Sequence, residues 1–341
     1  MEPTDSLLLT RKDVTQLLSM DECIIGVENA FRLHAEGLAQ PPKVLGIHSE
    51  NGGFHIKAGM LGSERKYFAA KVNANFPDNK MMYGLQTIQG IIVLCDAGNG
   101  RLLALMDSIE ITIIRTGAAT AVAAKYLAAE YAKIATICGC GNQGRISIEA
   151  LMKVRQLEKI YAFDLDQLQS EKFAKHFSNQ IEVVPITGND LHKALQKSQI
   201  CVTCTPSKKS FIRSEDITPG TFIAAVGADS EEKQELFSDL IASNKIVVDL
   251  VDQSVAIGEL HHVIQKGLMT AGDIYAELGD IIAGKKPGRE SGDEIIIFDS
   301  TGTALQDVAA AIIVYEKSMA GGIGAKLNFS QQESIHESRH L

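Results

Sequence analysis

The stretch Ile134-Ala-Thr-Ile-Cys-Gly-Cys-Gly-Asn-Gln-Gly144 is an apolar run that ends abruptly in glycines. Such a run predicts a buried strand that leads into a tight turn. Glycine lets the backbone approach the pyrophosphate of a dinucleotide, and the N-terminus of a following helix favours an anion. Apolar residues at helical spacing over 145–154 supply that helix. The stretch therefore predicts a strand, a phosphate-binding turn and a helix, with a plain strand-to-helix turn as the alternative.

The second apolar run after this turn, 159–163, ends at Asp164, twenty positions beyond the last glycine. A carboxylate at this place would accept hydrogen bonds from the ribose hydroxyls of NAD and would repel the 2′-phosphate of NADP. We therefore predict NAD as the cofactor, with NADP possible. The glycines match the pattern G-x-G-x-x-G, and the predicted contacts in the turn are Gly139, Gly141, Asn142, Gln143 and Gly144.

Length and charge bound the remaining possibilities. A chain of 341 residues suits two domains, each large enough to bury its own core. The formal net charge of −9 and the absence of a clustered basic face argue against a nucleic-acid partner. The first residues are acidic, without the basic and apolar parts of a signal peptide, and no apolar run approaches a membrane span. We therefore expect a soluble, cytoplasmic protein without a membrane partner.

The six cysteines do not suggest a disulfide framework in a chain of this size. Cys201 and Cys204 form a C-x-x-C pair, but residues three apart on a strand point to opposite faces. No second cysteine pair lies at the spacing of a zinc site. We therefore predict no metal site.

The first part of the chain predicts an α+β domain. Apolar residues at helical spacing indicate one or two helices over 11–39, which Pro41 and Pro42 would end. Short β-like runs then follow without helices between them, which suggests an antiparallel sheet. An alanine-rich helix is predicted over 110–129. The β-like runs are 54–57, 67–72, 88–95 and 102–106.

Strands and helices alternate in the second part, which is typical of a doubly wound parallel sheet of the α/β class. We assign 129–302 to this Rossmann domain. A final helix over 304–315 is expected to return to the first domain, which then comprises 1–128 and 303–341 and is discontinuous. The polar tail, 328–341, is expected to be frayed. The predicted strands are 134–138, 160–163, 181–184, 200–204, 221–226, 246–249 and 294–298.

Candidate chemistry lies beyond the carboxyl ends of these strands, where ligands bind in doubly wound sheets. Polar or small residues follow the strands at 204–207, 227–229 and 299–302. A strand-ending turn is the alternative for each segment taken singly. Three such segments beside a nucleotide turn favour a cleft.

Two cations of the first domain are candidates for the substrate site. Lys71 ends an apolar run, where burial would lower its pKa towards a value useful for proton transfer. Arg115 lies on the alanine-rich helix, where an unpaired guanidinium would be costly unless an anion meets it. A substrate carboxylate held in a bidentate fork would meet that need. An internal salt bridge is the alternative, and the sequence leaves it open.

Several motifs beyond the glycine turn are shared with one family. These motifs are Ile114-Arg-Thr-Gly-Ala-Ala119, Ala225-Val-Gly-Ala-Asp229 followed by Lys233-Gln-Glu-Leu236, and Phe298-Asp-Ser-Thr-Gly302 followed by Leu305-Gln-Asp307. With the glycine turn they resemble the ornithine cyclodeaminase and mu-crystallin family over nearly the whole chain. The second half is most similar to the archaeal alanine dehydrogenases of that family. The resemblance implies a Rossmann domain and a discontinuous α+β domain for substrate binding and dimerisation.

The resemblance also implies roles for individual residues. Lys71 would lie beside the reacting carbon, Arg115 would bind the substrate carboxylate, and Asp229 would contact the substrate amine or its water. Thr87 matches a substrate-contact position. Further cofactor contacts would be Thr205, Pro206, Val226, Ser300, Thr301 and Gly302.

One segment departs from the family pattern. Members usually carry Met-Pro-Ala before the lysine, often with a cation shortly before it, whereas this chain has His55-Ile-Lys-Ala-Gly59. Lys57 could replace the missing cation, as a similar lysine does in the iminosuccinate reductase branch, or could be an exposed lysine at a strand edge. His55 and Lys43 are further candidate substrate contacts. No acidic residue stands at the equivalent place to hold the terminal amine of ornithine.

These observations predict a homodimeric, NAD(P)-dependent oxidoreductase that acts at the C–N bond of an amino acid or on its imine. Alanine dehydrogenase-like and imine reductase activities both fit. The small-molecule substrate would be an amino acid, a 2-oxo acid or an imine. Alternatives are an ammonia-eliminating ornithine cyclodeaminase, a reductase of a dicarboxylic imine such as iminosuccinate, and a non-catalytic NAD(P)H- or ligand-binding protein like mu-crystallin.

Overall fold

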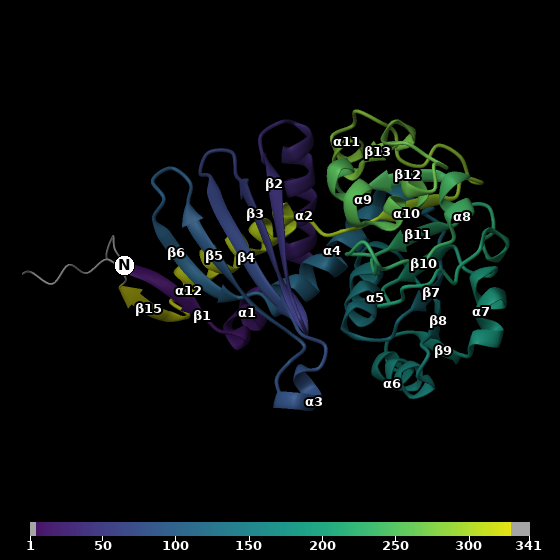
Figure 1. Cartoon of the computed structure of the whole chain (residues 1–341), viewed down its shortest axis with the longest axis horizontal. Coiled ribbons are helices and arrows are strands. Elements are labelled where there is room, and N and C mark those ends of the chain that lie inside the picture. The colour runs from purple at the N-terminus through teal and green to yellow at the C-terminus, as the bar shows by residue number, and fades with distance from the viewer. Residues whose placement is uncertain (1–4, 329–341) are drawn as a thin grey trace, which may run out of the picture.

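The computed structural model describes residues 5–328 and contains two β-sheets, one to each side of the molecule in Figure 1. One sheet has seven strands and the other has eight. Helix α4 (Ile109–Leu127) lies between them and packs against helices of both parts. One hydrophobic core continues from the first sheet through α4 to the second sheet, and a second core covers the far side of the second sheet.

The seven-stranded sheet has the order β15-β1-β6-β5-β4-β3-β2. Strands β2 to β6 pair in antiparallel fashion, which confirms the predicted antiparallel sheet. Strand β1 joins β6 in parallel, and β15 pairs with β1. The strands are β1 (Asp5–Leu9), β2 (Gln40–Ser49), β3 (Gly52–Leu61), β4 (Tyr67–Asn75), β5 (Ile88–Asp96), β6 (Leu102–Asp107) and β15 (Ala325–Asn328).

Four further helices accompany this sheet: α1 (Arg11–Leu17), α2 (Met20–Ala35), α3 (Asn79–Tyr83) and α12 (Ala304–Gly321). Ser and Thr side chains with an acid three residues later form capping boxes at the starts of α1 and α2. Helix α12 follows the last strand of the second sheet and packs on β3 and β4. This return carries residues of the C-terminal part into the core of the first domain.

The expected helix end at Pro41 and Pro42 is wrong. Helix α2 ends at Ala35, and Gly37 makes the turn with a φ of 75°, which glycine adopts without steric cost. Both prolines instead lie in β2. They fall in a register shift between Gln40 and Lys43 of this edge strand, where neither proline is paired with β3, so their missing N–H groups interrupt no regular ladder bond.

The eight-stranded sheet has the order β13-β12-β14-β11-β10-β7-β8-β9, and all of its strand pairs are parallel. The predicted doubly wound α/β fold is therefore confirmed. Its strands are β7 (Ile134–Cys138), β8 (Lys159–Phe163), β9 (Glu182–Ile186), β10 (Ile200–Thr203), β11 (Phe222–Ala225), β12 (Lys245–Val248), β13 (Ala276–Glu277) and β14 (Ile296–Asp299). The helices are α5 (Asn142–Val154), α6 (Gln167–Phe177), α7 (Gly188–Leu195), α8 (Ser238–Ala242), α9 (Val251–Ile257), α10 (Glu259–Gln265) and α11 (Leu278–Ile282), with 3₁₀ turns at Ser214–Asp216 and Ala271–Asp273.

No predicted run corresponds to strands β1, β2, β13 and β15 or to helix α3; all of these except the ten-residue β2 are short elements. The tail expected to be frayed begins at Asn328, which is the last residue of β15, and 329–341 lie outside the described residues. No helix among residues 5–328 is long and apolar enough to cross a membrane. The same residues contain no cluster of three or more side chains suited to holding a metal ion.

Candidate active site

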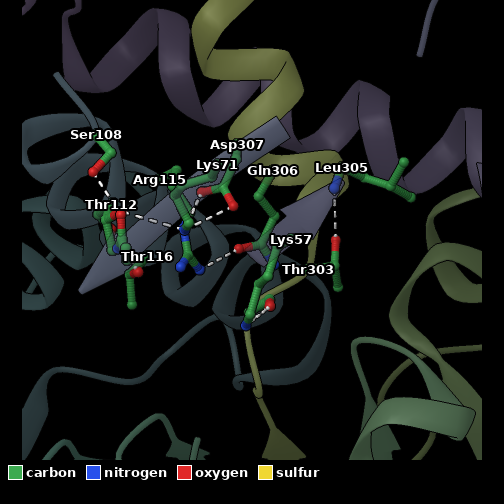
Figure 2. A network of polar contacts seen from close by, with 12 residues as sticks. Lys57, Lys71, Ser108, Thr112, Arg115, Thr116, Thr303, Leu305, Gln306 and Asp307 are labelled. Atoms are coloured by element: carbon green, nitrogen blue, oxygen red, sulfur yellow. Dashed lines mark hydrogen bonds and ion pairs between the residues drawn. The ribbon is translucent and has the colours of Figure 1, made fainter. Parts of the chain in front are cut away.

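Lys71 and Arg115 meet at one buried carboxylate, that of Asp307 (Figure 2). Strand β4 carries the lysine, α4 carries the arginine, and the first turn of α12 carries the aspartate. The Lys71 Nζ atom lies 2.7 Å and 2.8 Å from the two carboxylate oxygens, and Arg115 Nε donates to one of them at 3.0 Å. All three side chains are buried. The internal salt bridge that the sequence left open for Arg115 therefore exists.

Burial dominates the titration of this cluster. It lowers the pKa of Lys71 to about 7, although the Asp307 carboxylate pulls in the other direction. The nearby cations Arg115 and Lys57 lower that pKa further. The two cations of the cluster hold the pKa of Asp307 below its ordinary value despite its burial. Lys71 can therefore gain or lose a proton near neutral pH.

The guanidinium of Arg115 keeps unused donors beside this ion pair. Its Nη1 donates to Gln306 Oε1 at 2.7 Å, whereas its Nη2 makes no hydrogen bond within residues 5–328. The amide nitrogen of Gln306 is also buried without a partner in this range. A Cβ on Gly302, whose φ is 73°, would lie 2.5 Å from Arg115 Nη1. Only glycine therefore allows the loop after β14 to lie against the guanidinium.

Lys57 lies directly opposite Lys71 in the pairing of β3 with β4, so both side chains point to the same face of the sheet. Its Nζ donates to the carbonyl oxygens of Thr301 and Gly302, at 3.1 Å and 2.6 Å. Desolvation lowers the pKa of Lys57. The lysine thus links the first sheet to the loop after β14 and is not an exposed strand-edge lysine.

The glycine turn after β7 has the geometry of an anion site. Gly141 is the N-cap of α5, and no side chain caps the free N–H groups there. A Cβ on Gly144 would lie 2.0 Å from the carbonyl oxygen of Gly139, whereas a Cβ on Gly141 would meet no atom within 4 Å. Gln143 lies in the first turn of α5, beside these N–H groups. The residues present therefore fit a pyrophosphate.

Asp164 lies at the carboxyl end of β8, next to this turn. One carboxylate oxygen accepts a hydrogen bond from the N–H of Cys140 at 2.9 Å, and the other accepts one from the N–H of Asp166 at 3.0 Å. The side chain is half-buried. It therefore holds the turn in place, and its half-burial leaves part of the residue accessible.

The remaining predicted cofactor residues follow neighbouring strands at the same edge of the sheet. Thr205 and Pro206 follow β10, Val226 follows β11, and 300–302 follow β14. Strands β8 and β9 lie on one side of β7, and strands β10, β11 and β14 lie on the other, so the strand order reverses at β7. Ligands bind at such a reversal.

Asp229 and His55 lie in the same region but outside the buried cluster. Asp229 follows β11, and its carboxylate accepts a hydrogen bond from Lys233 Nζ at 2.6 Å. Desolvation raises the pKa of Asp229 and the Lys233 ammonium lowers it, with a net downward shift. His55 shares the Lys57 face of β3 and is half-buried, and desolvation lowers its pKa.

The structure does not bring Thr87 and Lys43 to the Lys71 cluster. Thr87 precedes β5 by one residue, and Ile92 of β5 is the residue opposite Lys71. Five residues of extended chain separate the two positions by roughly 17 Å. Lys43 pairs with Ala58, so its side chain points to the face opposite that of Lys57.

Sequence reasoning missed the roles of Gln306 and Asp307. Both were quoted in a family motif, but no function was given to them. Each is a buried polar side chain among alanine, valine and leucine in α12. A carboxylate on an otherwise apolar helix is costly unless it is paired, and this was the signal that could have identified Asp307 as the partner of Arg115.

Comparisons with known proteins identify the family of the chain. The model of the ornithine cyclodeaminase/mu-crystallin family matches residues 4–322. Alanine dehydrogenase of Archaeoglobus fulgidus is 38% identical over 327 residues, which cover 95% of this chain and 99% of that protein. A solved structure of an archaeal alanine dehydrogenase dimer with bound NAD is 37% identical, with a TM-score of 0.91 over 95% of this chain and 99% of the other.

A second solved structure is that of the Delta(1)-pyrroline-2-carboxylate reductase of Thermococcus litoralis in complex with NADH and L-proline. It is 35% identical and has a TM-score of 0.88, over 94% of this chain and all of the other. The similarity extends over both sheets and the residues between them. The chain belongs to the ornithine cyclodeaminase/mu-crystallin family, as its motifs predicted.

Proposed function

We propose that the chain is an NAD-dependent oxidoreductase that acts at the Cα–N bond of an amino acid or on the corresponding imine. The observation that carries this proposal is the Lys71–Asp307–Arg115 cluster, which lies against the loop after β14 of a dinucleotide-binding sheet. The names of the relatives, an alanine dehydrogenase and a pyrroline-2-carboxylate reductase, support it. Residues 129–302 form the cofactor domain, and 1–128 with 303–341 form the substrate domain.

Binding of the substrate carboxylate falls to Arg115 and Gln306. Arg115 Nη2 and Gln306 Nε2 are adjacent donors without partners in the described chain. A carboxylate is the group that accepts from two such donors at once. Because Asp307 balances only one of the two positive charges of Lys71 and Arg115, the site also has a charge that favours an anion.

Proton transfer at the substrate nitrogen falls to Lys71. When bound, the nicotinamide supplies hydride to an imine or accepts it from an amino acid. Lys71 donates a proton to the developing amine in reduction, and in its neutral form it accepts one in oxidation. A pKa of about 7 permits both. Asp229 orients the water that hydrolyses the imine in the oxidative direction.

Asp164 gives the preference for NAD over NADP, because its carboxylate would repel a 2′-phosphate. Replacing Asp164 with serine is expected to weaken the preference for NADH. A variant whose preference remains unchanged would contradict this assignment. We place the enzyme in the cytoplasm, where its six free cysteines would stay reduced.

We also propose a homodimer formed through the outer face of the seven-stranded sheet. Leu45, Ile56, Val72 and Ile91 lie opposite one another across β2, β3, β4 and β5 and form one apolar row. A hollow of about 600 Å³ lies on this face. Exposed apolar rows of this kind mark protein interfaces, and the archaeal alanine dehydrogenase was solved as a dimer.

The test is NADH oxidation, followed at 340 nm, with pyruvate plus ammonium, with pyrroline-2-carboxylate or with iminosuccinate. We expect turnover with at least one of them, and the preferred substrate then identifies the branch of the family. Lys71→Met should lower that rate by about 10²-fold to 10⁴-fold. Tight NADH binding without turnover of any substrate would contradict the proposal and favour a binding protein.

A further inference from the structure

Three buried carboxylates, Asp299, Glu259 and Glu235, are linked one to the next by hydrogen bonds to backbone N–H groups, and we call this series the carboxylate ladder. Asp299, at the end of β14, accepts hydrogen bonds from the N–H groups of Glu259 and Leu260, both at 3.1 Å. Glu259 in turn accepts from the N–H groups of Glu235 and Leu236, at 2.7 Å and 3.1 Å. Each carboxylate thus holds the backbone that carries the next one.

The last step of the ladder joins two loops. Glu235 Oε1 accepts from the N–H and the hydroxyl of Thr205, both at 2.7 Å, and Oε2 accepts from the N–H of Gly227 at 3.1 Å. The backbone pairing of β10 with β11 continues to the bond from Val226 N to Thr203 O, at 2.8 Å. The Glu235 carboxylate therefore extends the connection between the two strands beyond their ends.

The three acids are fully or almost fully buried, with exposed fractions of 0% for Glu235 and Glu259 and 1% for Asp299. None of them forms an ion pair with a lysine, arginine or histidine in the portion of the chain that the structure covers. Burial raises the pKa of Glu235 and of Asp299 to about 7. A buried carboxylate without an opposite charge is costly, so the hydrogen bonds from the backbone and from Thr205 are what stabilises these three groups.

The glycine at position 227 shows how closely the acid fits. A Cβ there would lie 2.2 Å from Glu235 Oε2 and 2.6 Å from the carbonyl oxygen of Thr205. The carboxylate and the two loops therefore occupy one tightly packed unit. Asp229 follows this unit by two residues, so its place depends on that of Gly227.

The strand order indicates which half of the cofactor these loops contact. Asp164 and β8 lie on one side of β7, where the adenosine half would bind. Thr205 and Gly227 follow β10 and β11 on the other side of β7. The nicotinamide half must extend to that side.

We propose that Glu235 is a positioning residue that fixes the loops of Thr205 and Gly227 around the nicotinamide half of the cofactor. This inference rests on the proposed function. The adenosine half is held independently, by the glycine turn and Asp164. Loss of the Glu235 carboxylate should therefore affect NADH and not ADP-ribose, which lacks the nicotinamide.

The test compares binding of NADH and of ADP-ribose to the full-length wild type and to Glu235→Gln, by calorimetry. A carboxamide has one acceptor oxygen, so its NH₂ group must face an N–H donor of Thr205 or of Gly227. We expect NADH to bind about tenfold more weakly, kcat to fall, and ADP-ribose affinity to stay the same. Glu259→Gln, one step further from the loops, should show a smaller loss in the same direction.

Asp216→Asn is the matched control. Asp216 is a buried carboxylate of the same domain that accepts from the N–H of Arg213 and contacts His192, and it bonds to neither Thr205 nor Gly227. The Asp216→Asn substitution should lower the Tm and leave the affinities for NADH and for ADP-ribose unchanged. Equal losses of NADH and ADP-ribose affinity in Glu235→Gln, or no loss of either, would overturn the inference.

Failure of this inference can be distinguished from failure of the proposed function. If the wild type binds neither ligand, the proposed cofactor site itself is wrong. If Glu235→Gln does not fold, Glu259→Gln decides, since an NADH-selective loss supports the ladder and parallel losses contradict it.

Discussion

At the scale of single residues, the charge balance of the Lys71 cluster explains its chemistry. One carboxylate, Asp307, serves two buried cations, and Lys57 adds a third cation on the same face of the sheet. Burial lowers the pKa of Lys71 most, Arg115 and Lys57 lower it further, and a substrate carboxylate would raise it again. Substrate binding and the protonation of Lys71 are therefore linked.

The two directions of the reaction should depend on pH in opposite ways. Protonated Lys71 is needed for reduction, so kcat/KM for the imine should fall as pH rises through about 7. Neutral Lys71 is needed for oxidation, so kcat/KM for the amino acid should rise through the same range. Initial rates measured across neutral pH test this. The Lys71→Met variant should show neither the fall nor the rise of kcat/KM near pH 7. A pH dependence that persists in this variant would belong to another titrating group.

Asp307→Asn should move the pH dependence of kcat/KM that Lys71 controls to lower pH. The carboxylate raises the pKa of Lys71, so its removal lets the remaining cations lower the pKa further. It also leaves the buried Arg115 guanidinium, and Lys71 where it is protonated, without a carboxylate partner, which should cost about 3–5 kcal/mol of unfolding free energy. Urea denaturation and pH–rate profiles measure the two effects. Asp21→Asn is the control, because its exposed ion pair with Lys153 should contribute only about 0–1 kcal/mol.

At the scale of elements, the turn between β7 and α5 separates two uses of glycine. Gly144 allows the first turn of α5 to pack against the end of β7, where even a methyl group would collide with a carbonyl oxygen. Gly141 faces open space at the start of the helix. One glycine is required by the fold and the other by the ligand.

Alanine substitutions should distinguish these two uses. Gly144→Ala should lower the unfolding free energy by about 1–3 kcal/mol, because the backbone must shift to relieve the contact. Gly141→Ala should leave stability nearly unchanged and weaken NADH binding on the order of tenfold, because its Cβ would occupy the approach of the pyrophosphate. Thermal denaturation and NADH fluorescence titration report the two quantities. A destabilised Gly141→Ala protein with normal NADH affinity would contradict this division.

Helices and strands could be predicted from the sequence where the pattern that indicates them lies within a few neighbouring residues. The run from Ile134 to Gly144 contains a strand, a turn and a helix start within a few residues, and the structure confirms each. Strand β1 and strand β15 had no such signal, since their pairing joins Asp5 to Asn328. The partner of Arg115 was likewise hidden, because Asp307 reaches it only when α12 folds back onto β4.

At the scale of the whole molecule, the two faces of the seven-stranded sheet differ in what covers them. Helix α12 packs on β3 and β4 at the inner face. The outer face keeps its apolar row of Leu45, Ile56, Val72 and Ile91 without such a cover in the described chain. A second copy of the chain is the cover that we propose.

Charges placed in this row should prevent dimerisation. In the double variant Leu45→Glu/Ile91→Glu, each dimer would bury several carboxylates without partners, at a cost that exceeds the gain from the contact. Sedimentation velocity should show a monomer in place of a dimer. Leu165→Glu is the control, because Leu165 is 96% exposed beyond β8 in the other domain. A double variant that remains a dimer would place the interface elsewhere.

The pairing of β1 with β15 has a consequence for the order of events during synthesis. The strands of the Rossmann sheet are contiguous between Ile134 and Asp299, so that sheet can fold before the last part of the chain leaves the ribosome. The first sheet lacks only its edge strand β15 until the end of synthesis, but Lys71 has no carboxylate partner until Asp307 of α12 has been made. A nascent chain should therefore acquire the ability to bind NADH before it acquires a site for the amino acid, and catalytic competence should arise only when translation is nearly complete.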